Sequence, residues 1–184
     1  MMRPALLSAA VLALSAMAAP GMTQERPNAD QAAAAVLYQY CVPLFAPGPV
    51  HGDRINATAS MAQLTPAPDG ARPLGFPRAD AGYVAASPGD TAVLVFWIGD
   101  PGVCQIVLLG PAGVGDGLLG SMTEVGWQPQ QQNVASGEDT AASVWTAQPR
   151  GYDTPLLVVA NRWTSEEEPV GGVRLVINVM RPQP

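Results

Sequence analysis

TAVLVFWI, at residues 91–98, and VCQIVLL, at residues 103–109, are the clearest pair of β-strand candidates in the chain. Both segments are rich in β-branched, aromatic and aliphatic residues, which favour strands. The tetrapeptide GDPG between them supplies the proline and glycine that a tight turn uses. The sequence therefore predicts a β-hairpin. Because both strands are apolar on both faces, we expect them at the centre of a covered sheet.

The C-terminal half predicts three further strands, at residues 142–148, 155–163 and 172–180. Short links join them, so we expect antiparallel pairs. A glycine-rich segment at residues 111–125 follows the hairpin and begins with a proline, which suits the first turn of a helix. We expect this helix to cross from one sheet edge to the other, and residues 128–140 to form a polar loop.

The N-terminal part predicts a helix at residues 28–42. Asn28 is a candidate N-cap, and Gln31 stands where a capping box needs it. Apolar residues recur at helical spacing on one side: Ala33, Val36, Leu37, Tyr40 and Cys41. Pro43 is expected to limit this helix. A shorter helix is predicted at residues 53–64, followed by a long loop at residues 65–87.

Together these elements predict an α+β fold. An N-terminal helix packs on a roughly five-stranded, mainly antiparallel sheet, with a crossover helix between the second and third strands. This order of elements resembles that of profilin-like and PAS-like folds. The resemblance is one of element order alone, and it implies no function.

Residues 1–18 have the pattern of a secretory signal peptide. Arg3 is the basic residue, the following apolar stretch has 14 residues, and Ala-Met-Ala precedes the expected cleavage point. The stretch is shorter than the roughly 20 residues that a membrane helix needs, so we expect no transmembrane span. Residues 19–184 are then expected to form a single globular domain that is secreted or periplasmic.

Cys41 and Cys104 are the only two cysteines. In an exported protein an even count favours a disulfide, and with two cysteines only one pairing exists. The bond would tie the N-terminal helix to the second strand of the hairpin. For a loop of this length the chain-entropy model predicts a stabilisation of about 4 kcal/mol.

The composition excludes several classes of function. The chain has no lysine, which removes Schiff-base chemistry and the P-loop lysine. Lys and Arg total 9 against 15 acidic residues, which argues against a nucleic-acid partner. One histidine and two cysteines are too few for a structural zinc site of the usual kind. We therefore expect neither a metal nor a cofactor.

Few residues are candidates for a functional site. His51 is the single histidine, so any serine-type triad must use it as the base. Trp127 and Trp163 fall at the ends of predicted elements, where a half-exposed indole forms a binding surface. GDGLLG, at residues 115–120, matches a dinucleotide-binding pattern, but it follows an antiparallel hairpin. We interpret its glycines as small residues that let a helix lie close to the sheet.

These observations predict a non-enzymatic binding or accessory module outside the cytoplasm, with a small ligand or another exported protein as its partner. One alternative is a hydrolase that uses carboxylates or His51. A second alternative is a structural component of the cell envelope, which would present a broad flat apolar surface.

Overall fold

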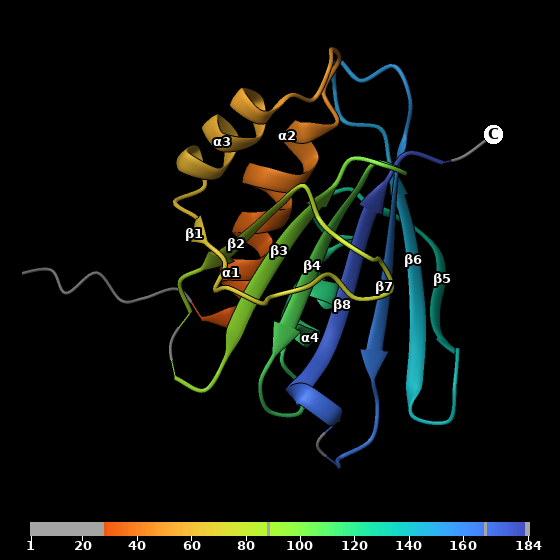
Figure 1. Cartoon of the computed structure of the whole chain (residues 1–184). Helices are drawn as coiled ribbons and strands as arrows, with labels where there is room; N and C mark the ends of the chain where they lie inside the picture. Colours follow the sequence, from red (N-terminus) through yellow and green to blue (C-terminus); the bar gives the residue numbers. More distant parts are fainter. Residues whose placement is uncertain (1–27, 88, 168, 183–184) are drawn as a thin grey trace, which may run out of the picture.

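A computed structural model describes residues 28–87, 89–167 and 169–182 of the chain. The predicted signal peptide, at residues 1–18, lies outside these described residues. The described chain forms one antiparallel sheet of eight strands in the order β1-β2-β3-β4-β8-β7-β6-β5 (Figure 1). The β3–β4 hairpin that the sequence predicts lies inside this sheet, so that prediction is confirmed.

The strands are β1 (Thr65–Pro66), β2 (Ala81–Ala85), β3 (Ala92–Ile98), β4 (Val103–Leu109), β5 (Gln128–Ala135), β6 (Thr140–Ala147), β7 (Leu156–Trp163) and β8 (Val173–Met180). The helices are α1 (Ala29–Ala35), the π-helix η1 (Val36–Cys41), α2 (Val42–Leu44), α3 (Gly52–Met61), α4 (Asp116–Ser121) and the 3-10 helix η2 (Val170–Gly172).

The predicted fold, a helix packed on a five-stranded sheet, is wrong because the sheet has eight strands. β1 and β2 occupy the predicted loop at residues 65–87, and β5 occupies the predicted loop at residues 128–140. β5 is an edge strand whose residues are all exposed, so no apolar face marks it in the sequence. The predicted helix at residues 111–125 shrinks to α4, since Gly113 and Gly115 adopt positive φ.

The N-terminal helical run continues from α1 through η1 into α2. Asn28 and Gln31 form the capping box that the sequence predicts. Pro43 was expected to limit the helix, yet the run extends through α2. The widened turn of η1 precedes Pro43, and in it the N–H of Val42 donates to the carbonyl of Leu37. The buried side of the run packs into the main core against β3 and β4.

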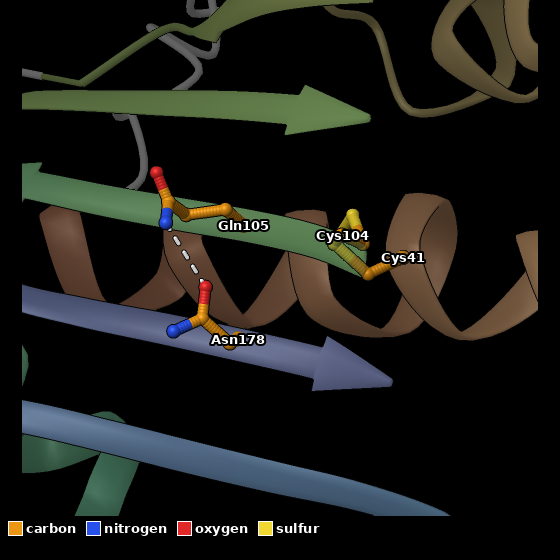
Figure 2. Close-up of a disulfide and its surroundings, with 4 residues drawn as sticks. All are labelled: Cys41, Cys104, Gln105 and Asn178. Carbon is orange, nitrogen blue, oxygen red and sulfur yellow. Dashed lines mark hydrogen bonds between the residues drawn. A yellow bond between two sulfur atoms is a disulfide. The ribbon is translucent and has the colours of Figure 1, made fainter. Parts of the chain in front are cut away.

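The disulfide between Cys41 and Cys104 is confirmed. The two Cα atoms are 5.5 Å apart, and both residues are fully buried. Figure 2 shows Cys104 directed toward the helix that carries Cys41, whereas the next residue, Gln105, is directed toward Asn178 of β8. Successive residues of β4 therefore serve opposite faces of the sheet.

The second face is covered in part by the segment between β1 and β2, which crosses the front of the sheet in Figure 1. Gln105 holds this segment. Its side-chain amide accepts a hydrogen bond from the Leu74 N–H at 2.6 Å and donates to the Leu74 carbonyl at 2.9 Å and to Asn178 Oδ1 at 3.0 Å. A buried polar side chain thus fixes a long loop that has little secondary structure of its own.

Replacing Tyr40 by phenylalanine is expected to stabilise the protein by about 1 kcal/mol. Tyr40 is fully buried, and its hydroxyl has no hydrogen-bond partner in the described chain. The variant removes this unsatisfied group and keeps the edge-to-face ring contact with Tyr83, whose centroid lies 5.6 Å away. Urea denaturation measures the change. As a control, Tyr152→Phe removes a hydroxyl that donates to the Val42 carbonyl at 2.9 Å, so it should destabilise.

Tyr40→Phe should also change how the free energy of unfolding depends on alkaline pH. Burial raises the pKa of Tyr40 far above its usual range. In the unfolded chain the hydroxyl ionises near pH 10, so Tyr40 lowers the stability of the fold progressively above about that pH. Tyr40→Phe should lose this dependence. Equal alkaline slopes for the two proteins, or a less stable variant, would contradict this account of the hydroxyl.

Candidate functional site

A polar cleft of about 360 Å³ lies between α4 and the β5–β7 end of the sheet. We call it the Arg162 cleft. Polar side chains from four elements and the loop after α4 line it, namely Asp116, Thr123, Gln132, Asn133, Ser143 and Arg162, and Trp145 lines it as well. Its size is within the range of small-molecule binding sites.

An ion pair crosses this cleft. Arg162 Nη1 donates to Asp116 Oδ1 at 2.7 Å, and Arg162 Nη2 donates to Asn133 Oδ1 at 3.2 Å. The pair is partly open to solvent, with 31% of the Arg162 side chain and 47% of the Asp116 side chain exposed. An exposed pair of this kind contributes little to stability, about 0–1 kcal/mol. The ion pair therefore contributes less to stability than to the polar groups that are available in the cleft.

Asn133 reaches the ion pair because β5 is irregular. The pairing of β5 with β6 shifts register on both sides of Gln131, and Asn133 adopts a φ of 50°. Its backbone N–H donates to Ser143 Oγ at 2.9 Å, which anchors the irregular turn to β6. Bulges of this kind re-aim side chains and are frequent beside functional sites.

Two residues that line this cleft carry buried hydrogen-bond donors without a partner in the part of the molecule that the structure describes. In the described parts of the chain, three buried side-chain polar atoms lack a partner, and two of them, Trp145 Nε1 and Arg162 Nε, belong to residues that line the cleft. A guanidinium has five N–H groups. Among the described residues, only Asp116 and Asn133 accept hydrogen bonds from the Arg162 guanidinium. Buried donors without partners are rare in native proteins and call for an explanation.

A second cleft, of about 170 Å³, shares the same ion pair with the first. We call it the Arg174 cleft. Asp116 and Arg162 line it as well, together with Trp163, Glu166 and Arg174. Arg174 is 6% exposed, and its Nη1 donates to the Ser165 and Glu167 carbonyls at 2.9 Å each. Trp163 Nε1 donates to the Glu167 carbonyl at 3.1 Å, so the indole is held in place at the cleft.

The glycine-rich motif at residues 115–120 does not offer a phosphate site. Asp30 of α1 accepts hydrogen bonds from the Gly115 N–H at 2.6 Å and from the Gly117 N–H at 3.0 Å. A carboxylate of the protein thus occupies the position that a phosphate would take. A Cβ at Gly117 would meet Asp30, and one at Gly115 would meet Leu175. Gly115 and Gly117 therefore permit close packing of this segment, which agrees with the interpretation of the motif as a set of small packing residues.

Comparisons with protein-family models, curated proteins and solved structures find no match. Within the described ranges, no group of three or more His, Cys, Asp or Glu side chains is placed to hold a metal ion. The helices described there are also too short or too polar to cross a bilayer. What the site can bind is therefore inferred from the geometry of its residues.

The candidates from the sequence lie apart. His51 is exposed in front of α3 and is absent from the lining of both clefts. Trp127 is 3% exposed and donates from Nε1 to Tyr38 Oη at 3.1 Å, so the prediction that it is half-exposed is wrong. It packs in the core beside α4. Trp163 is partly buried and lines the Arg174 cleft.

The sequence did not point to Arg162 or Asn133 as residues of a site. One signal was available, because Arg162 stands near the end of the apolar strand sequence LLVVANRW, on the same face as buried residues. A charged residue on a buried face indicates a partner or a site. Asn133 carried no such signal, since its role depends on an irregularity in an edge strand.

Proposed function

We propose that this protein is an exported, non-enzymatic binding module that takes a small polar ligand in the Arg162 cleft. The observation that supports this proposal most directly is the Asp116–Arg162 ion pair, which Asn133 joins and which is partly open to solvent in a cleft of about 360 Å³. A ligand with donor and acceptor groups can bond to the polar groups that this pair exposes.

Export is supported by two features of the chain. The first is the signal-peptide pattern at residues 1–18. The second is the disulfide between Cys41 and Cys104, a bond that persists in oxidising compartments such as the periplasm or the extracellular medium.

The alternative functions have less support. A hydrolase needs a base within reach of a nucleophile or a second carboxylate. His51 is exposed outside both clefts, and of the two carboxylates that line the Arg174 cleft, that of Asp116 is bound to Arg162 and Glu166 is exposed. A structural envelope component needs a broad flat apolar surface. On the outer face of β7 and β8, the valines alternate with Asn161 and Asn178, so this face is not continuously apolar.

Gly120 offers a way to block the Arg162 cleft without disturbing the fold. It lines the cleft from α4, and a Cβ at this position would meet no atom within 4 Å. Gly120→Leu therefore places a side chain in the cleft at little steric cost. Gly120→Ala is the matched control, because it makes the same change of backbone preference and adds only a methyl group.

The test is a thermal-melting screen of the oxidised protein with magnesium chloride, AMP, glucose, maltose, glycylglycine and citrate. A compound at one hundred times its Kd should stabilise the wild-type protein by about 2.7 kcal/mol. Gly120→Leu should abolish that shift, and Gly120→Ala should keep it. A shift that survives Gly120→Leu would place the site elsewhere, and no shift with any compound would count against a small-molecule ligand.

A further inference from the structure

The charge balance of the site indicates the class of its ligand. The Arg162 cleft holds one positive and one negative side chain, Arg162 and Asp116, and its other polar side chains are amides and hydroxyls. The Arg174 cleft adds one charge of each sign, Arg174 and Glu166. Because the charges balance in both clefts and the whole chain has a net charge of −6, the site has no net positive charge to attract an anion.

The hydrogen-bonding groups favour a ligand that both donates and accepts. The Asp116 carboxylate accepts, the Arg162 guanidinium donates, and the amides and hydroxyls of Gln132 and Thr123 do both. Neighbouring hydroxyl groups of a sugar have the same mixed capacity and carry no charge. Their oxygens provide acceptors for the partly exposed guanidinium of Arg162.

The two clefts favour a ligand of more than one ring. They meet at the ion pair, since Asp116 and Arg162 line both, and their volumes are about 360 and 170 Å³. In the smaller cleft Trp163 presents an aromatic ring whose N–H is bound to the Glu167 carbonyl. Such a ring gives the apolar face of a sugar a surface on which to stack.

We propose that the ligand is a neutral carbohydrate with at least two rings, bound across the Asp116–Arg162 ion pair with one ring in each cleft. This inference rests on the proposed function, because it names the ligand class of the same site. It assigns donor and acceptor roles to Arg162 and Asp116, and it assigns stacking of the second ring to Trp163.

The test is calorimetric titration of the oxidised full chain. The neutral probes are glucose, N-acetylglucosamine, maltose, cellobiose and chitobiose, and the charged probes are glucuronate, glucosamine, phosphate and glycylglycine. We expect a neutral disaccharide to bind more tightly than its monosaccharide. Arg162→Gln and Asp116→Asn should each weaken its binding by about tenfold. Gly120→Leu leaves the ion pair in place and should also remove binding. It therefore tests the site even if Arg162→Gln or Asp116→Asn fails to fold.

Substitutions at Trp163 distinguish a loss of stacking from a general effect on the fold. Trp163→Ala should weaken disaccharide binding by about fivefold and leave monosaccharide binding unchanged, and Trp163→Phe should retain most of the affinity. Binding of glucuronate, phosphate or glycylglycine in place of every neutral sugar would overturn the carbohydrate inference and leave the binding module intact. Equal affinity for one ring and two would overturn the two-ring arrangement. The absence of binding by every probe would count against both proposals.

Discussion

Replacing both Cys41 and Cys104 by alanine is expected to lower the free energy of unfolding by about 4 kcal/mol. The disulfide closes a loop of 63 residues, and without it the unfolded chain gains the conformational entropy that this loop removes. A domain of ordinary stability has only about 5–15 kcal/mol in total. The variant should therefore lose a large share of its margin and unfold at much lower urea concentration.

Alanine is the suitable replacement because both cysteines are fully buried in the core, where a serine hydroxyl would have to find a partner. The matched control is the wild-type protein in dithiothreitol, which should unfold at nearly the same urea concentration as the variant. The variant itself should not respond to the reductant. If oxidised wild type and variant have equal midpoints, the bond contributes nothing to stability.

The sequence predicts best those parts of this fold that depend on local pattern. The β3–β4 hairpin follows from two apolar segments and a turn, and the capping box at Asn28 follows from residue spacing. The disulfide follows from a count of two cysteines with one possible pairing. None of these inferences needs knowledge of distant contacts.

The strands that the sequence missed depend on such contacts. β5 is a polar edge strand that is held by pairing with β6, and β1 is only two residues long. Neither carries the alternation of apolar and polar residues that marks a half-buried strand. Together with β2, these two strands account for the difference between five predicted strands and eight, since tertiary pairing outweighs local preference toward the sheet edges.

The candidate site was hidden for the same reason. Asp116, Asn133 and Arg162 are far apart in sequence, and only the fold places them together. Residues that stand out by type, such as the single His51 and the four tryptophans, attract attention in the sequence whether or not the fold uses them. Of these, Trp163 is partly exposed at a cleft, and Trp127 is part of the core.

Replacing Gly115 by alanine should destabilise the protein by about 3 kcal/mol, since two costs add. Gly115 has a φ of 90°, a left-handed conformation that an L-residue adopts at a cost of about 1–2 kcal/mol. Its Cβ would also press into the Leu175 side chain and lie 3.2 Å from Leu108 Cδ2, and overpacking of a core costs about 1–3 kcal/mol. Urea denaturation measures the sum.

Gly120→Ala is the matched control, because it changes the same residue type within the same glycine-rich motif. Gly120 has no positive φ and open space at its Cβ, so alanine there should stabilise α4 by up to about 1 kcal/mol. The two variants should thus move stability in opposite directions. If both were neutral, the close approach of this segment to β8 would have no energetic importance.

Gly115 also connects the fold to the proposed site. The residue that follows it, Asp116, forms the ion pair with Arg162 at 2.7 Å, and the Gly115 N–H is bound to Asp30 of α1 at 2.6 Å. A side chain at Gly115 would push this segment away from Leu175 and carry the Asp116 carboxylate with it. Any Gly115→Ala protein that still folds should therefore bind ligand more weakly, whereas Gly120→Ala should bind normally. Full affinity in folded Gly115→Ala would mean that the Asp116–Arg162 pair is not what positions the ligand.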